Sequence, residues 1–166
     1  MLLCIRLFAC LLILAVYSNF EAHVFASSHT LVSEEELKSL QFTGYESINP
    51  NLLIFPVKRI VENFNLKLKR NKNDKVKYQF LLFDIRFKEL VFIINFQKTG
   101  FLEETVERYN SFIGDTILNN KEVWLLQKNQ ISTYIIILKS LQDRYNSESA
   151  YRLLIQQAID STRRII

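Results

Sequence analysis

The chain has 166 residues and a formal net charge of +4 at pH 7, and it contains only three glycines and two prolines. The length fits one domain, and so few helix-breaking residues favour an all-α protein. The modest charge does not by itself indicate nucleic-acid binding. Both cysteines and both histidines lie before residue 30, which excludes disulfides, thiolate nucleophiles and Cys/His zinc sites from the rest of the chain.

Residues 1–26 have the pattern of an export signal. One positive charge precedes ten apolar residues at 7–16, and a polar patch then leads to a small side chain at Ala26. We therefore predict cleavage between Ala26 and Ser27 and an exported protein, secreted or held on the outer side of the cytoplasmic membrane. Two alternatives stay open: the segment is retained as an N-terminal membrane anchor, or it is a lipoprotein signal that ends at Cys10.

Residues 27–55 are predicted to form a leader to the domain. Ser33 suits a helix cap, and the acidic residues 34–36 suit the first turn of a short helix that ends near residue 41. The stretch that follows contains a glycine and a proline and indicates an extended connection. We place the helical domain itself over residues 56–166.

The domain is predicted to open with an amphipathic helix of about fifteen residues. Pro56 suits its first turn because the fixed φ of proline matches a helix. The apolar side chains on one face recur at helical spacing, at Val57, Ile60, Val61, Phe64 and Leu68. The opposite face carries the charged residues Lys58, Arg59, Glu62, Lys67 and Lys69. Such a helix needs a partner for one face.

A long helix over about residues 73–98 is predicted to be the centre of the fold. It carries two apolar sets, namely Val76, Phe80, Phe83, Phe87, Leu90 and Ile94, and Tyr78, Leu81, Leu82, Ile85, Phe92 and Phe96. The residues predicted to face solvent are Lys77, Asp84, Lys88 and Asn95. We also place Arg86 and Glu89 on this solvent-facing side of the helix, which we call the wet side. Two dry faces indicate neighbours on both sides. We expect Gly100 to follow the end of this helix.

Three further amphipathic helices are expected, over about residues 101–118, 121–145 and 148–166. Gly114 lies inside the first of them, where we expect a close helix crossing or an early end. The run at 134–139 is β-branched, but the helical pattern on both sides favours a helix. Because the links are short, successive helices should be antiparallel neighbours. The predicted fold is an all-α antiparallel bundle of about five helices around one long central helix.

Clustered carboxylates are the only candidates for acid–base chemistry. They occur at 34–36 and at 103–104, each in the first turn of a predicted helix, where the helix dipole accounts for them. No Gly-rich phosphate loop, nucleophile elbow, HExxH motif or EF-hand loop is present in the sequence. We therefore predict no catalytic residue, no cofactor and no metal.

The distribution of charge along the sequence is uneven at one place, a run of positive charge at residues 67–77. It contains six basic residues in eleven with a single acid, Asp74, and we name it the basic corner: Lys67, Lys69, Arg70, Lys72, Lys75 and Lys77. One interpretation is contact with an anionic surface such as a membrane, and the other is a solvated link between two helices. No aromatic or glycine pattern accompanies it, so we predict no nucleic-acid partner.

The segment 56–113 resembles a known family. The features that carry the resemblance are the opening Pro56-Val57-Lys58-Arg59, the long helix with its run from Phe83 to Leu90, a glycine break, and Glu107-Arg108-Tyr109. In these the segment is similar to the domain of unknown function 5667 family, an uncharacterised group of exported bacterial helical proteins. The resemblance implies an exported α-helical domain and no site residues.

Three functional hypotheses follow from the sequence. The first is an exported, non-enzymatic helical domain that binds an unknown protein partner at the cell envelope. The second is a membrane-surface module that uses the basic corner, and the third is an extracytoplasmic enzyme. The lack of catalytic motifs favours the first two.

Overall fold

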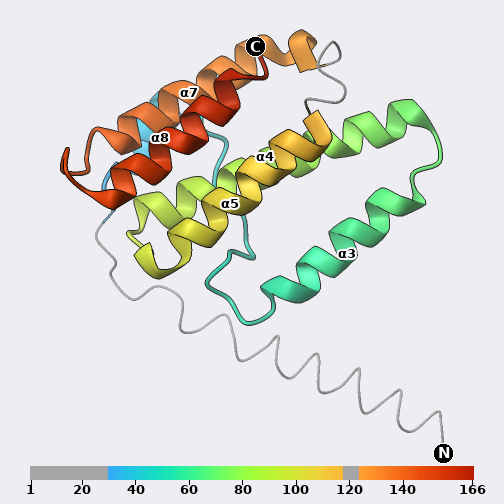
Figure 1. Cartoon of the computed structure of the whole chain (residues 1–166), viewed down its shortest axis with the longest axis horizontal. Coiled ribbons are helices and arrows are strands. Elements are labelled where there is room, and N and C mark those ends of the chain that lie inside the picture. Colours follow the sequence, from blue (N-terminus) through green and yellow to red (C-terminus); the bar gives the residue numbers. More distant parts are fainter. Residues whose placement is uncertain (1–29, 118–123) are drawn as a thin grey trace, which may run out of the picture.

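A computed structural model describes residues 30–117 and 124–166 of the chain. The described residues contain no strand, which confirms the prediction of an all-α protein (Figure 1). The α-helices are α2 (Glu34–Ser39), α3 (Phe55–Leu68), α4 (Lys72–Asn95), α5 (Leu102–Phe112), α7 (Lys128–Gln142) and α8 (Ala150–Arg163). Short 3₁₀ turns η1 (Thr99–Phe101) and η4 (Leu125–Gln127) and a π turn η2 (Ile113–Ile117) complete the assignment.

Helix α4 forms the centre of the bundle, as predicted. Helices α5 and α7 pack against it and α8 packs against both of those, while α3 lies along the opposite edge of α4 (Figure 1). The core side of α4 is dry because Phe83, Phe87, Leu90 and Ile94 are fully buried. The apolar run at 134–139 lies inside helix α7, so the helical interpretation of this run is confirmed.

Aromatic rings fill the middle of the core. Phe83 lies with its ring centroid 5.7 Å from that of Tyr109 and 5.8 Å from that of Trp124. Phe87 stacks on Tyr134 at 3.8 Å, with only 10° between the ring planes. These contacts join α4 to α5 and α7 through side chains that are far apart in the sequence. Offset and edge contacts between aromatic rings stabilise the fold beyond the contribution of their buried apolar surface.

The water-facing position predicted for Asn95 is wrong. Its side chain is fully buried: Oδ1 accepts a hydrogen bond from the Val32 N–H at 2.8 Å, and Nδ2 donates to the Val32 carbonyl at 3.0 Å and to the Tyr45 hydroxyl at 2.8 Å. The Leu31 N–H donates to the Asn95 carbonyl at 3.0 Å. The leader segment therefore covers the end of α4 and replaces the water that this amide would otherwise bind.

Glutamine, and not glycine, stands where α2 and α4 end. Gln41 and Gln97 have positive φ values of 63° and 51°. In each case the next residue donates its N–H back into the last helical turn, Phe42 to the Leu37 carbonyl and Lys98 to the Ile93 carbonyl, both at 3.0 Å. This is the Schellman arrangement. Helix α4 thus ends at Asn95, earlier than predicted, and Gly100 lies in the η1 turn.

No close helix crossing occurs at Gly114. No atom of a neighbouring element lies within 4 Å of the position that a Cβ would occupy there. Helix α5 ends at Phe112 and the chain continues as the π turn η2, so Gly114 lies in that turn and the regular α-helix ends before it.

Replacing Gln41 with glycine should stabilise the protein by about 0.5–1 kcal/mol, because glycine adopts the left-handed conformation without the steric cost of a Cβ. The matched control is Gln157→Gly at an exposed position inside α8, which should cost about 1 kcal/mol. Urea denaturation of both variants measures the difference. A loss of stability in Gln41→Gly would contradict the left-handed geometry.

Candidate functional site

Helix α3 presents its apolar side to solvent. The side chains of Ile60 and Phe64 are 69% and 60% exposed, although both belong to the predicted apolar stripe. We call this surface the apolar face of α3, and its members are Val57, Ile60, Val61, Phe64 and Leu68. A surface helix of a globular protein normally turns such a stripe toward the core. The described residues provide no partner for the apolar face of α3.

Charged side chains fill the space between α3 and α4. Lys58 Nζ donates to Glu89 Oε1 at 2.8 Å, and Arg59 donates to Glu89 Oε2 at 3.0 Å and to Glu62 Oε2 at 2.6 Å. Arg86 of α4 reaches Glu62 Oε2 at 3.3 Å. We call this set the charged network. Because every member is paired with an opposite charge, the network holds the polar side of α3 against α4.

The predicted wet side of α4 is therefore wrong for Arg86 and Glu89, as it is for Asn95. Glu89 is only 1% exposed and Arg86 is also buried, because α3 lies over that side of the helix. The sequence carried only an indirect signal for this. Basic and acidic residues three or four apart lie on one face of each helix, so two such faces can also pair with each other. Asp84 and Lys88, which were predicted for the same side, pair with each other at 2.8 Å as expected from their i,i+4 spacing.

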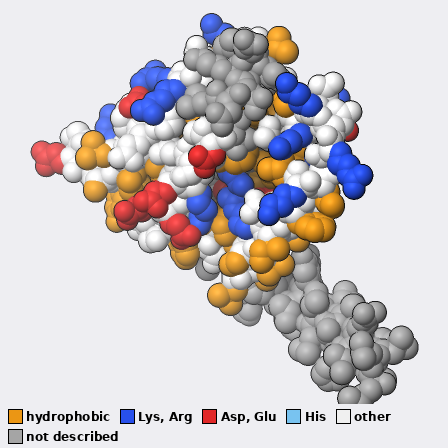
Figure 2. Space-filling view, turned by 45° about the vertical axis from the view of Figure 1, so that its right-hand side comes forward, with side chains coloured by type: hydrophobic (Ala, Val, Ile, Leu, Met, Phe, Trp, Pro, Cys, Tyr) orange, Lys and Arg blue, Asp and Glu red, His pale blue; other side chains and the backbone are white. Residues whose placement is uncertain are grey.

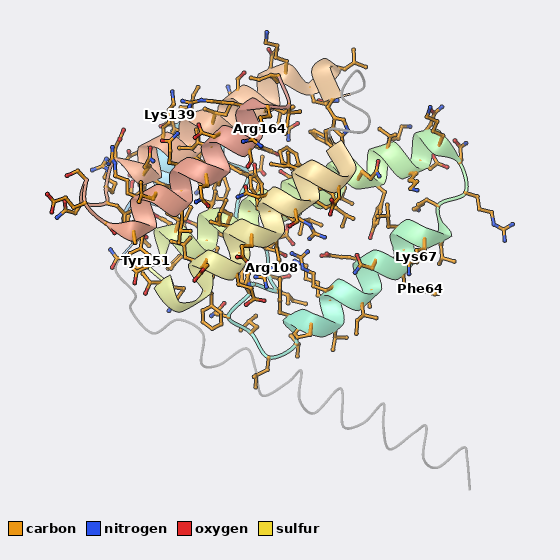
Figure 3. The ribbon with its side chains drawn as sticks, in the orientation of Figure 1. Phe64, Lys67, Arg108, Lys139, Tyr151 and Arg164 are labelled. Carbon is orange, nitrogen blue, oxygen red and sulfur yellow. The ribbon has the colours of Figure 1, made fainter. Side chains whose placement is uncertain are left out.

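Aromatic rings support the guanidinium groups around the charged network. The Arg59 guanidinium lies 4.8 Å from the centroid of the Phe55 ring, and the Arg108 guanidinium of α5 lies 5.0 Å from the same ring. Arg86 lies over Phe112 at 4.6 Å. Cation–π contacts of this kind stabilise charges that have lost part of their water. Figure 3 shows Arg108 on the side of α5 that is turned toward α3.

Burial shifts the pKa of two charged groups at the contact between α3, α4 and α5. It raises the pKa of the Glu62 carboxyl, while the nearby Arg59 opposes that shift. Burial also lowers the pKa of the Arg108 guanidinium, and the nearby Glu104 opposes this change. Both directions are those that partial desolvation of a charged group produces. The arrangement is that of a structural contact.

The structure places all six residues of the basic corner at the surface. They lie at the end of α3, in the link, and at the start of α4. Within the described residues none of the six takes part in an ion pair, and Lys69 lies 5.6 Å from the Tyr78 ring. Figure 3 shows Lys67 beside Phe64 on α3, so the basic corner continues the apolar face of α3.

Both surfaces are visible from one direction. Figure 2 shows hydrophobic side chains along the lower right of the molecule with Lys and Arg side chains above and beside them. Acidic side chains gather on the other side of the same view. The part of the surface that contains α3 therefore combines exposed apolar groups with positive charge.

A pocket of about 430 Å³ with a mixed polar and apolar lining lies on another side of α4, against α7. Asp84 accepts a hydrogen bond from the Tyr134 hydroxyl, and Gln130 donates to the same hydroxyl at 2.6 Å. Lys88 pairs with the second oxygen of Asp84. Asp84, Lys88, Gln130 and Tyr134 thus pair with one another, and the aromatic floor of the pocket, Phe42, Phe87 and Tyr134, is buried.

The clustered carboxylates lie in the first turns of α2 and α5, as predicted. Ser33 caps α2 by accepting from the Glu36 N–H at 3.1 Å, and Glu36 pairs with Arg144 at 3.0 Å. Glu104 pairs with Arg108 one turn later. In the part of the chain that is described, no group of three His, Cys, Asp or Glu residues could hold a metal ion.

The export signal lies outside the described residues, and so do Ala26 and Ser27 at the predicted cleavage site. Among residues 30–117 and 124–166, no helix has the length and hydrophobicity needed to cross a bilayer. Searches of family models, of curated proteins and of solved structures found no match to this chain. The resemblance to the domain of unknown function 5667 family and the prediction of export both stay predictions.

Proposed function

We propose that the chain is a non-enzymatic binding module at the cell envelope and that it contacts its partner through the apolar face of α3. The observation that carries the proposal is the orientation of α3, whose five apolar side chains face solvent while Lys58, Arg59 and Glu62 are turned toward α4. A contiguous exposed apolar surface on a globular domain is characteristic of an interaction site.

The charged network supports this proposal because it fixes the orientation of α3. Turning α3 over would bury the apolar face but would expose or unpair Glu89, which is buried on α4 and bonded to Lys58 and Arg59. An unpaired buried carboxylate is strongly destabilising. The fold thus keeps an apolar surface available to a partner, at a site where no acid–base constellation is present among the described residues.

The proposal is tested by measuring whether the apolar face of α3 is covered in the cell. A thiol introduced by Phe64→Cys should react readily with a maleimide in the purified protein, since the position is exposed. In intact host cells its labelling should be slower by about tenfold or more, because a bound partner excludes the reagent. Peptide mapping separates this thiol from Cys4 and Cys10.

The matched control is Leu153→Cys on α8, where the side chain is 65% exposed and far from α3 in the sequence. It should be labelled at similar rates in purified protein and in cells. Equal labelling of the two introduced thiols in cells would show that the apolar face of α3 is not covered and would contradict the proposed function.

A further inference from the structure

We infer that the partner of the apolar face of α3 is an anionic lipid surface, into which α3 inserts along its side while the basic corner binds the headgroups. This inference rests on the proposed function and names the partner of the same surface. Three features of the described residues support it: the composition of the apolar face, the charge that surrounds it, and the pairing of the polar groups behind it.

The apolar face of α3 has the composition of a membrane-interface helix. Its side chains are four aliphatic residues and one phenylalanine. Protein interfaces concentrate their binding energy in Trp, Tyr and Arg anchors that enter pockets, and the apolar face of α3 contains none of these residues. A single convex helix with an apolar side, a charged side and low net hydrophobicity matches the helices that lie in the plane of a membrane.

The charge around α3 is complementary to anionic headgroups. From residue 63 to residue 83 the only acid is Asp74, and the six residues of the basic corner are exposed. The acid of α3 itself, Glu62, is turned inward and bonded to Arg59 and Arg86. No carboxylate of α3 therefore opposes an approaching anionic surface, and each exposed Lys or Arg near such a surface strengthens binding.

Insertion of α3 leaves each charged side chain of its buried side with an oppositely charged partner. Lys58, Arg59 and Glu62 are bonded within the charged network, so they need not lose further water when the outer face enters the lipid. Lys67 flanks the apolar face of α3, and its long side chain can extend to the headgroups while its methylenes stay among apolar groups. The helix can thus enter the interface without rearranging the bundle.

The test measures co-sedimentation of the full chain with vesicles of phosphatidylglycerol and phosphatidylcholine, and with vesicles of phosphatidylcholine alone. Binding to the anionic vesicles should exceed binding to the neutral ones by about tenfold or more. Phe64→Ser should reduce binding because it removes the largest side chain of the apolar face of α3. The double variant Lys67→Gln/Arg70→Gln should reduce it by about tenfold or more.

Two control variants correct for the apolar N-terminal segment, which is present in every sample. Leu153→Ser removes an exposed apolar side chain from α8, and Lys139→Gln/Arg164→Gln removes two exposed charges from α7 and the end of α8. Figure 3 shows Lys139 and Arg164 on the side of the bundle away from α3. Both controls should bind anionic vesicles like the unmodified chain. Equal binding by all variants would overturn the inference.

Thiol labelling separates failure of the inference from failure of the proposed function. Anionic vesicles should protect the Phe64→Cys thiol from maleimide, and neutral vesicles should not. Protection in cells without protection by anionic vesicles would leave the proposed function standing and would assign the partner to protein. Protection that appears in the purified protein as its concentration rises would assign it to a second copy. Either result overturns the lipid inference.

Discussion

Replacing Phe83 with alanine should lower the free energy of unfolding by about 3–5 kcal/mol. The ring is fully buried in α4 and lies against Tyr109, Trp124 and Tyr134, so its removal leaves a cavity bounded by large rigid groups. Such groups cannot easily collapse into the space, and the loss includes both the transfer of the ring and the cavity. Denaturation in urea, followed by circular dichroism, measures this quantity.

The control for Phe83→Ala is the same substitution at Phe64, which should change the free energy of unfolding by about 0.5 kcal/mol or less because that side chain is mostly exposed. The contrast between the two variants also tests the orientation of α3. A loss under about 1 kcal/mol for Phe83→Ala would show that this side of α4 is exposed. A loss of several kcal/mol for Phe64→Ala would show that the apolar face of α3 belongs to the core.

Replacing Glu89 with alanine should lower the free energy of unfolding by about 3–5 kcal/mol. This carboxylate accepts from Lys58 at 2.8 Å and from Arg59 at 3.0 Å, and it is almost completely buried. Its removal leaves two cations of α3 without their principal partner on α4. Urea denaturation measures the loss, and amide hydrogen exchange in α3 should accelerate because the helix loses its attachment to α4.

The control for Glu89→Ala is Glu103→Ala, at an exposed position in the first turn of α5. There only a favourable contact with the helix dipole is lost, so the expected cost is about 0.3–1 kcal/mol. Similar small losses in both variants would contradict the charged network as the attachment of α3. A large loss with unchanged exchange in α3 would locate the effect elsewhere in α4.

The sequence predicted the helices well because their apolar periodicity is strong. The helix around Phe83 and Phe87, its central place and the exposure of the basic corner near Lys67 all follow from local pattern. The orientation of α3 does not follow from the local sequence pattern. Periodicity shows that a helix has an apolar side, but the choice of which side meets the bundle depends on charges such as Glu89 that lie about thirty residues away.

Single polar residues account for most of the other errors. Asn95 was placed in water because an amide on a helix usually faces solvent, and its true partners belong to the leader around Val32. The end of α4 was placed near Gly100 because glycine is the common residue after a helix, whereas Gln97 adopts the left-handed conformation instead. Hydrogen-bond partners that are distant in the sequence cannot be recognised from local pattern. The same holds for uncommon backbone conformations.

The hydrogen bonds of Asn95 also determine how the domain would respond to mechanical force. Within the described residues, a pull applied at residue 30 would first reach residues 31 and 32, and these are joined to Asn95 by one backbone bond and two side-chain bonds. The three bonds end on one residue, so they would share the load. Force applied there would therefore pass directly into α4, the central helix, and would not be taken up by the leader segment alone.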